Sequence, residues 1–252
     1  MIGSGQVKDF PQRELLLGWV MAIGTLNEGP LHAALKATYV AHGGDAEVPV
    51  EGFVADAVRG GIMYEVQTGS FSGLGRKLKK LLDVGPLVLV HPIPATTYIV
   101  KIDAAGEVLP GRRRSPKRGA LINIVGELVY IPQLLEHPNF SVEVILTEEE
   151  EWRVHDPKKR RGRGGWRTVE RHLLKILDTA RIGGPEDLME FVEADLPVPF
   201  TTRDLSVALD EPLSVAQQMA YCLRHSGLTE ICGKQGNALR YDFTREPFIT
   251  FA

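Results

Sequence analysis

The predicted hairpin over residues 53–67 holds the side chains best suited to chemistry, because it brings two carboxylates onto neighbouring strands. Alternating residues predict strands over 53–58 and 62–67, and the pair Gly60-Gly61 between them suits a tight turn. Asp56 lies on the first strand, and Glu65 shares one face of the second strand with Gln67. Paired carboxylates bind hard divalent cations such as Mg²⁺ or Mn²⁺. We therefore expect Asp56 and Glu65 to form a metal site, the alternative being two surface carboxylates on an exposed sheet face.

The segments on either side of this hairpin predict elements that would support such a site. Upstream, Asn27 is a good N-cap for a helix over residues 27–39, with Glu28 in its first turn. A glutamate at that place has two explanations, since it can point at a metal or only complement the helix dipole. Downstream, residues 72–82 predict a helix and residues 86–90 a buried strand bounded by prolines.

The predicted elements follow the order helix, strand, strand, helix, strand, and the carboxylates lie on the hairpin. This arrangement resembles the PD-(D/E)xK nuclease superfamily over roughly residues 25–150. The resemblance implies an α/β fold with a restriction-endonuclease-like mixed central sheet flanked by helices. It also implies that Asp56, Glu65 and Glu28 hold Mg²⁺ or Mn²⁺ for phosphodiester hydrolysis.

One position departs from the pattern of that superfamily, because Gln67 stands where its members usually carry lysine. A glutamine amide cannot take a proton from water near neutral pH, although its oxygen can hold a water or a metal. Some members of the superfamily keep glutamine there, and others have moved the lysine to the following helix. Gln67 is therefore expected to position water, with Lys77 or Lys80 as the alternative route.

Composition limits the class of protein. The chain has 252 residues, 44% of them hydrophobic, and a net charge of −3, all ordinary for a globular protein. The apolar residues 15–24 are too few to span a membrane and follow acidic rather than basic residues, so they predict a core-packing helix. Cys222 and Cys232 lack zinc-ligand spacing and suit a reducing compartment. We expect a cytoplasmic protein without membrane contact.

Because the whole chain is slightly acidic, nucleic-acid contact has to be local. One basic cluster covers residues 112–118, and a second surrounds glycines between residues 156 and 167. A flexible basic loop fits a phosphate backbone without reading bases. The alternative is a solvated loop that balances the acidic residues 148–151. The predicted nucleic-acid contacts of the second cluster are Lys158, Lys159, Arg160, Arg161 and Arg163.

The remaining pattern predicts an edge or late strand over residues 140–146 and a helix over residues 168–177. This helix is expected to end a first domain of residues 1–182, which a second domain of residues 183–252 follows. In the second domain we expect helices over 185–194, 201–209 and 214–227, followed by a hairpin of strands 228–232 and 238–243. Three helices followed by a hairpin resemble the winged-helix family. That resemblance makes the third helix a recognition helix, with Gln217 and Arg224 as nucleic-acid contacts.

Together these patterns predict a metal-dependent nuclease acting on DNA, with RNA as an open alternative and with a C-terminal winged-helix domain that aids nucleic-acid or partner binding. The competing interpretation is a catalytically silent nuclease fold that acts as a nucleic-acid-binding or regulatory module. A protein partner or a homodimer also remains open, since a winged helix with little charge can dock onto protein.

Overall fold

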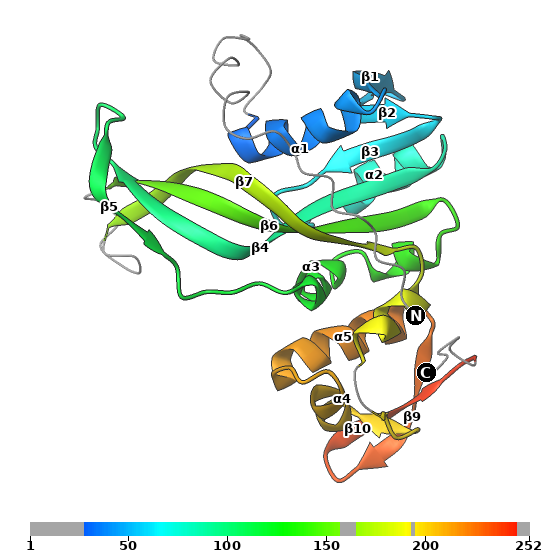
Figure 1. Cartoon of the computed structure of the whole chain (residues 1–252). Coiled ribbons are helices and arrows are strands. Elements are labelled where there is room, and N and C mark those ends of the chain that lie inside the picture. The colour runs from blue at the N-terminus through cyan, green and yellow to red at the C-terminus, as the bar shows by residue number, and fades with distance from the viewer. Residues whose placement is uncertain (1–27, 157–164, 193–194, 246–252) are drawn as a thin grey trace, which may run out of the picture.

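The computed structural model describes residues 28–156, 165–192 and 195–245. Residues 15–24, Asn27 and the five loop cations from Lys158 to Arg163 lie outside this part of the chain, so the predictions made for them stay predictions. Figure 1 shows a large twisted sheet with helices on both faces and a smaller C-terminal unit beneath it. The C-terminal unit has a small sheet of its own.

Within the described residues, seven strands form the large sheet in the order β1-β2-β3-β4-β6-β7, with β5 paired to β4. The pairs β3–β4 and β4–β6 are parallel and the others antiparallel. The fold is therefore mixed α/β with a mixed central sheet flanked by helices, and this coarse prediction is confirmed. The strands are β1 (Asp45–Val50), β2 (Phe53–Arg59), β3 (Ile62–Val66), β4 (Leu87–Ile102), β5 (Val108–Arg114), β6 (Phe140–His155) and β7 (Trp166–Ile182).

Helices cover the two faces of this sheet and create two apolar clusters. On one face α1 (Pro30–Ala41) buries Leu31, Leu35 and Tyr39, spaced as one side of a helix requires. On the other face lie α2 (Gly75–Leu82) and α3 (Val125–Leu128). The 3₁₀ helices of the chain are η1 (Leu121–Ile124), η2 (Pro132–Glu136) and η3 (Pro185–Phe191).

The predicted hairpin is confirmed as β2 and β3. Gly60 and Gly61 have φ angles of +58° and +78°, the left-handed values that a two-residue turn with both central φ angles positive demands. The pairing runs from Arg59 with Ile62 to Ala57 with Tyr64. The local turn chemistry thus fixes the register of the strands that carry Asp56 and Glu65.

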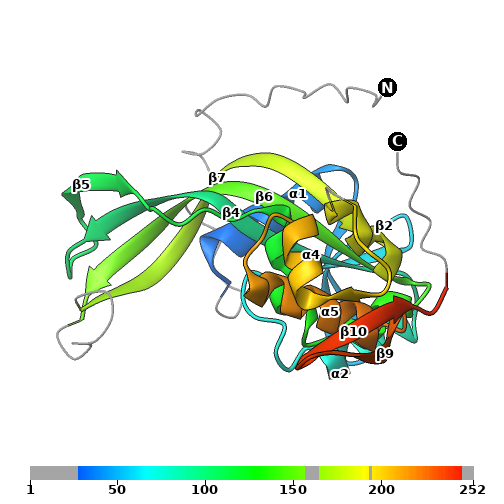
Figure 2. The same cartoon turned by 90° about the horizontal axis from the view of Figure 1, so that it is seen from below.

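One prediction about the later strands is confirmed and one is wrong. Residues 140–146 form a late strand rather than an edge strand, because they begin β6, which lies between β4 and β7. Residues 168–177 do not form a helix, because they belong to β7, which pairs with β6 along its whole length. Three register shifts in that ladder interrupt the alternation expected of a strand. Figures 1 and 2 show β4, β6 and β7 extending together beyond β1, β2 and β3, with β5 at the extended end.

The C-terminal unit contains β8 (Phe200–Thr201), α4 (Thr202–Ala208), α5 (Leu213–His225), β9 (Thr229–Gln235) and β10 (Ala238–Phe243). Its strands form a small sheet in the order β8-β10-β9, which confirms the predicted hairpin. The side chain of Thr201 caps α4, whereas α5 begins after Pro212 and has no side-chain cap.

The same apolar cluster continues from the large sheet into the C-terminal unit, since Leu128 of α3 and Met219 of α5 both belong to it. The thiol of Cys222 in α5 also lies 3.8 Å from the carbonyl oxygen of Val125. The face of α5 that carries these residues is therefore covered by the N-terminal part of the chain. None of the helices in the described ranges is long and apolar enough to cross a membrane.

Candidate active site

Asp56 and Glu65 lie where β2 and β3 stop pairing. The last pair of the ladder is Ala57 with Tyr64, so the two carboxylates occupy the next position on each strand. Oδ2 of Asp56 accepts a hydrogen bond of 2.8 Å from the backbone N–H of Val66. The side chain of Asp56 thus accepts a hydrogen bond from a backbone N–H of β3 beyond the last β2–β3 pair. The two acidic residues lie where the two strands are no longer paired.

Glu65 is a buried carboxylate with one partnered and one unpartnered oxygen. Its residue is only 6% exposed, and its Oε2 lies 2.6 Å from Nζ of Lys77. Its Oε1 is buried and has no hydrogen-bond partner among the described residues. Burial raises the pKa of Glu65 to about 7, with a further increase from the charge of Asp56 and an opposing effect from Lys77.

Lys77 reaches this carboxylate from the first turns of α2. The neighbouring candidate, Lys80, instead lies with its Nζ 5.5 Å from the centre of the Phe53 ring. Of the two lysines considered from the sequence, only Lys77 turns toward Glu65. Its ammonium also lies 3.4 Å from the carbonyl oxygen of Val54 on β2, so it spans both strands of the hairpin.

Asp56 is held by an imidazole. Nε2 of His32 lies 3.2 Å from Oδ2 of Asp56, and Nδ1 of the same ring lies 2.5 Å from Oε1 of Glu28. Burial alone would raise the pKa of Asp56, but the hydrogen bonds from His32 and Val66 lower it below its usual value. Burial would lower the pKa of His32, yet its two carboxylate partners raise it. The pair therefore favours an ionised Asp56 beside a protonated imidazole.

Glu28 does not lie in the first helical turn, where it was predicted. It precedes α1, whose N-cap is Gly29, so it is not in the first turn of that helix. The His32 ring lies between it and Asp56 and contacts both carboxylates. Within the described ranges, no group of three or more histidine, cysteine, aspartate or glutamate side chains has an arrangement that could hold a metal ion. The expectation that Glu28 converges directly with the other two carboxylates is therefore wrong.

Gln67 supports the turn that follows β3. Its Nε2 donates a hydrogen bond of 2.9 Å to the carbonyl oxygen of Ser70. Its backbone N–H donates to the carbonyl of Val90, and its own carbonyl accepts from Nδ1 of His91. Burial lowers the pKa of His91, which favours a neutral ring. These contacts make Gln67 a structural element of the site edge.

Neither Lys36 nor His32 was predicted as a site residue. Lys36 lies 2.8 Å from Oε2 of Glu28 and 3.1 Å from Oε1 of Glu47, and these bonds help to lower the pKa of Glu28 against the effect of burial. The available signal was the spacing of His32 and Lys36 by four residues, which places both on one face of α1, while Glu28 lies just before the helix.

The predicted nucleic-acid contacts of the C-terminal unit are both exposed. Gln217 and Arg224 lie on the outer face of α5 together with Tyr221. The opposite face of the helix is buried through Met219, Cys222 and other apolar residues. The available surface of α5 is thus a narrow strip along one side of the helix.

Comparison with known proteins places the chain in a family. Residues 29–183 match the family described as a domain of unknown function, DUF8091. An "Uncharacterized protein" of Treponema pallidum (strain Nichols) is 32% identical over 187 residues, which cover 74% of each chain. No solved structure gives a significant match. The matched residues run from the start of α1 to the end of β7 and include the whole hairpin with its carboxylates. The chain therefore belongs to the DUF8091 family.

Proposed function

We propose that this protein is a metal-dependent nuclease that hydrolyses phosphodiester bonds in DNA, with RNA as an open alternative. In this proposal residues 1–182 form a restriction-endonuclease-like domain, and residues 183–252 form a winged-helix domain that aids nucleic-acid or partner binding. The observation that carries the proposal is the buried Glu65, which lies beside Asp56 and is reached by Lys77 from α2. The family match names no activity, so the proposal rests on this geometry alone.

The donor set fits a hard divalent cation. Oε1 of Glu65 is buried without a hydrogen-bond partner among the described residues, and burying such a carboxylate is costly unless something compensates its charge. The charge of Asp56 raises the pKa of Glu65, so the two groups lie close enough to repel each other. Carboxylate oxygens are the ligands that Mg²⁺ and Mn²⁺ prefer. Asp56 and Glu65 would hold the ion, and Glu28 would support Asp56 through His32.

The side chains of the site have separate roles in the proposed hydrolysis. A bound Mg²⁺ or Mn²⁺ would supply a water of lowered pKa and neutralise charge on the phosphate. In this hydrolysis the attacking water would lose one proton to solvent as its oxygen bonds to phosphorus, the phosphorus–oxygen ester bond would break, and the leaving oxygen would take up a proton from solvent. A lysine ammonium has three donors and no acceptor, so Lys77 in its charged form orients water or a phosphate oxygen. His32 keeps Asp56 ionised and fixes its orientation.

A second candidate function has an observation in its favour. In this structure Lys77 and His32 already compensate Glu65 and Asp56 within the protein. Such internal pairing suits a catalytically silent nuclease fold that binds nucleic acid or regulates a partner. Incubation of the purified protein with plasmid, single-stranded and branched DNA in Mg²⁺ or Mn²⁺ separates the two functions. Metal-dependent cleavage supports the enzyme, and salt-sensitive binding without cleavage supports the silent module.

A further inference from the structure

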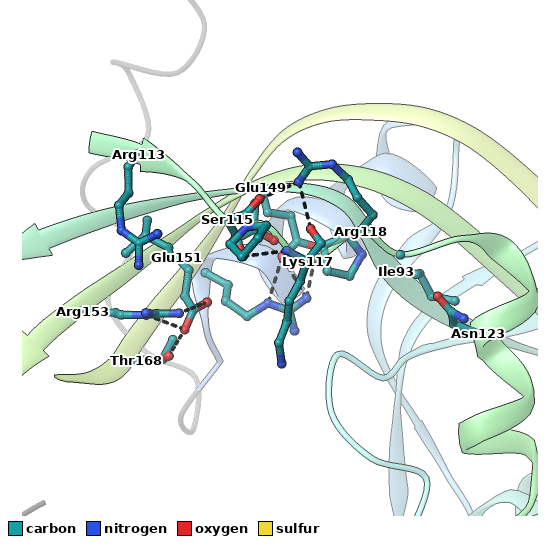
Figure 3. A pocket seen from close by; sticks show the side chains of 16 residues that line it. Ile93, Arg113, Ser115, Lys117, Arg118, Asn123, Glu149, Glu151, Arg153 and Thr168 are labelled. Carbon is teal, nitrogen blue, oxygen red and sulfur yellow. Dashed lines mark hydrogen bonds and ion pairs between the residues drawn. The ribbon is translucent and has the colours of Figure 1, made fainter. Parts of the chain in front are cut away.

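A long groove of about 720 Å³ lies along the part of the sheet that extends past the hairpin. Its floor is β4 from Ile93 to Ile99, one wall comes from the end of β5 and the segment after it, and the other wall comes from β6 and β7. Figure 3 shows Lys117 between Arg113 near one end and Asn123 at the other. No role proposed above involves this groove.

The charges on the groove are unevenly balanced. Both acidic side chains that line it are paired, since Glu149 lies 2.8 Å from Arg171 and Glu151 lies 3.0 Å from Arg153. The opposite wall carries a second set of cations with no ion pair in the described part of the chain. They are Arg113, Lys117 and Arg118. A groove with paired acids on one side and three uncompensated cations on the other attracts a ligand with several negative charges.

The cationic wall is fixed to the sheet by backbone contacts. The N–H of Ser115 donates a 2.7 Å hydrogen bond to the carbonyl of Thr97, and the N–H of Gly119 donates a 3.0 Å bond to the carbonyl of Pro94. A Cβ at Gly119 would come within 2.6 Å of the Ile93 side chain, so only glycine permits this close approach. The backbone that carries these cations is therefore already ordered before a ligand binds. This lowers the conformational entropy that the wall loses on binding.

The groove is connected to the carboxylate site through Arg171. The guanidinium of Arg171 donates two hydrogen bonds to the buried Glu149 and a third, of 3.0 Å, to the carbonyl of Thr68. Thr68 follows Glu65 by three residues. Along the sheet, β3 ends at Val66, which pairs with Val90, and the groove begins three residues farther along β4 at Ile93. The groove thus starts where the strand that carries Glu65 ends.

We propose that this groove binds the phosphodiester backbone of a nucleic acid on its way to the Asp56–Glu65 site. The choice of a nucleic acid rests on the proposed function, whereas the preference for a polyanion rests on the groove itself. Arginine and lysine side chains that meet phosphates confer affinity without base recognition and make binding depend on salt. The bound strand lies between the paired wall and the cationic wall, with Lys117 directed into the groove.

Equilibrium binding of the full chain to fluorescein-labelled DNA of arbitrary sequence tests this proposal, with EDTA present so that cleavage plays no part. The test variant is Arg113→Gln/Lys117→Gln, because both positions are exposed and neither side chain donates a hydrogen bond to another described residue. The matched control is Lys79→Gln/Lys175→Gln, which removes the same charge at exposed positions outside the groove and outside the C-terminal unit. Denaturant unfolding of both variants verifies that each is folded.

We expect the groove variant to bind at least about tenfold more weakly at low salt, with a slope of log K against log salt reduced by about 1.4 for single strands or about 1.8 for duplex. The control should keep the wild-type affinity. Equal losses in both variants, unchanged binding in the groove variant, or no DNA binding by the wild type would overturn the proposal. Wild-type affinity for polyglutamate as high as for DNA would reassign the groove to an acidic peptide. Because no cleavage is measured, the outcome is independent of whether the carboxylate site is catalytic.

Discussion

Lys77 and Glu65 form a contact of 2.6 Å between a helix and a strand that are separated by the turn after the hairpin. The ammonium comes from α2 and the carboxylate from β3, so the pair exists only because α2 packs under the sheet. One oxygen of Glu65 is engaged by this contact and the other has no partner in the described part of the chain. The same carboxylate thus has one oxygen engaged by a lysine and another that is open to the cation that we propose.

The first prediction concerns the position of the active lysine. If the cleavage that we propose occurs, Lys77→Ala should reduce kcat by about 100-fold or more, because it removes a charge beside the reacting phosphate. Lys80→Ala is the matched control and should retain nearly full activity, since Lys80 lies over Phe53. Gln67→Ala should leave a measurable remainder because its amide supports the turn at Ser70. A loss in Lys80→Ala as large as that in Lys77→Ala would contradict this assignment.

The second prediction follows from the raised pKa of Glu65, which is about 7 in the folded chain. The unfolded chain has the lower, ordinary value, so between the two pKa values the folded state binds more protons and stability falls as pH rises. Ionised Glu65 therefore costs roughly 3 kcal/mol of folding free energy above neutral pH. Glu65→Gln should be more stable than the wild type at pH about 8 and should lose this advantage at pH about 4.

Urea denaturation at both pH values measures this effect. The control is Glu143→Gln, because Glu143 accepts a hydrogen bond from Tyr39 elsewhere on the sheet and should show no such gain at high pH. An equal change in stability at both pH values for Glu65→Gln would show that its pKa is not raised in the folded protein.

The third prediction concerns metal binding without reference to activity. Mn²⁺ should raise the Tm of the wild type, with a stabilisation of about 2.7 kcal/mol when the ion is present at about 100 times its Kd. The rise should be larger at pH about 8 than at pH about 6, because a protonated Glu65 cannot bind the ion. Asp56→Asn should remove most of it. A rise that persists in Asp56→Asn would place the bound ion elsewhere on the protein.

The fourth prediction concerns the buried pair beside the groove. Glu149 is 1% exposed and Arg171 supplies its charge partner, so Arg171→Met leaves a buried carboxylate without compensation. We expect a loss of about 3–5 kcal/mol in the free energy of unfolding. Combining Arg171→Met with Glu149→Gln should recover part of this loss. Thermal or urea unfolding of the single and double variants makes the comparison, and an unchanged stability of the single variant would show that the pair is not coupled.

The hairpin was predictable because its determinants are local. Gly60 and Gly61 can adopt the positive φ angles of the turn, and the alternation on either side sets which residues face the sheet. The position of Asp56 opposite Glu65 follows from that turn. The sequence left both Lys77 and Lys80 as candidates for the lysine of the site. The choice between them depends on how α2 packs against the sheet, which the sequence pattern does not determine.

Strand β7 was not predictable from its pattern, and the reason lies in its register. The ladder with β6 skips Val169, Leu174 and Leu177, and these are exposed apolar residues of the strand. Each extra residue turns the following side chains to the other face, so the strand shows a spacing that resembles a helix. The bulges also make it harder for this long edge strand to pair with a strand of another chain.

The contacts of His32 with Glu28 and Asp56 could be predicted from the sequence only in part. The sequence indicates that Glu28 and His32 are close, because only three residues lie between them. It does not indicate that α1 packs against the hairpin so that the ring stands between the two carboxylates. Contacts of this kind depend on tertiary packing, which neither spacing nor periodicity encodes.

Cleavage of nucleic acid by the purified full chain is the most direct measurement of the central claim. We predict that the wild type cuts DNA in Mg²⁺ or Mn²⁺ and not in EDTA, and that Asp56→Asn and Glu65→Gln each abolish the cutting while remaining folded. Absence of cleavage of any plasmid, single-stranded or branched DNA by the wild type, or cleavage that survives in both carboxylate variants, would contradict the assignment of Asp56 and Glu65 as a nuclease site.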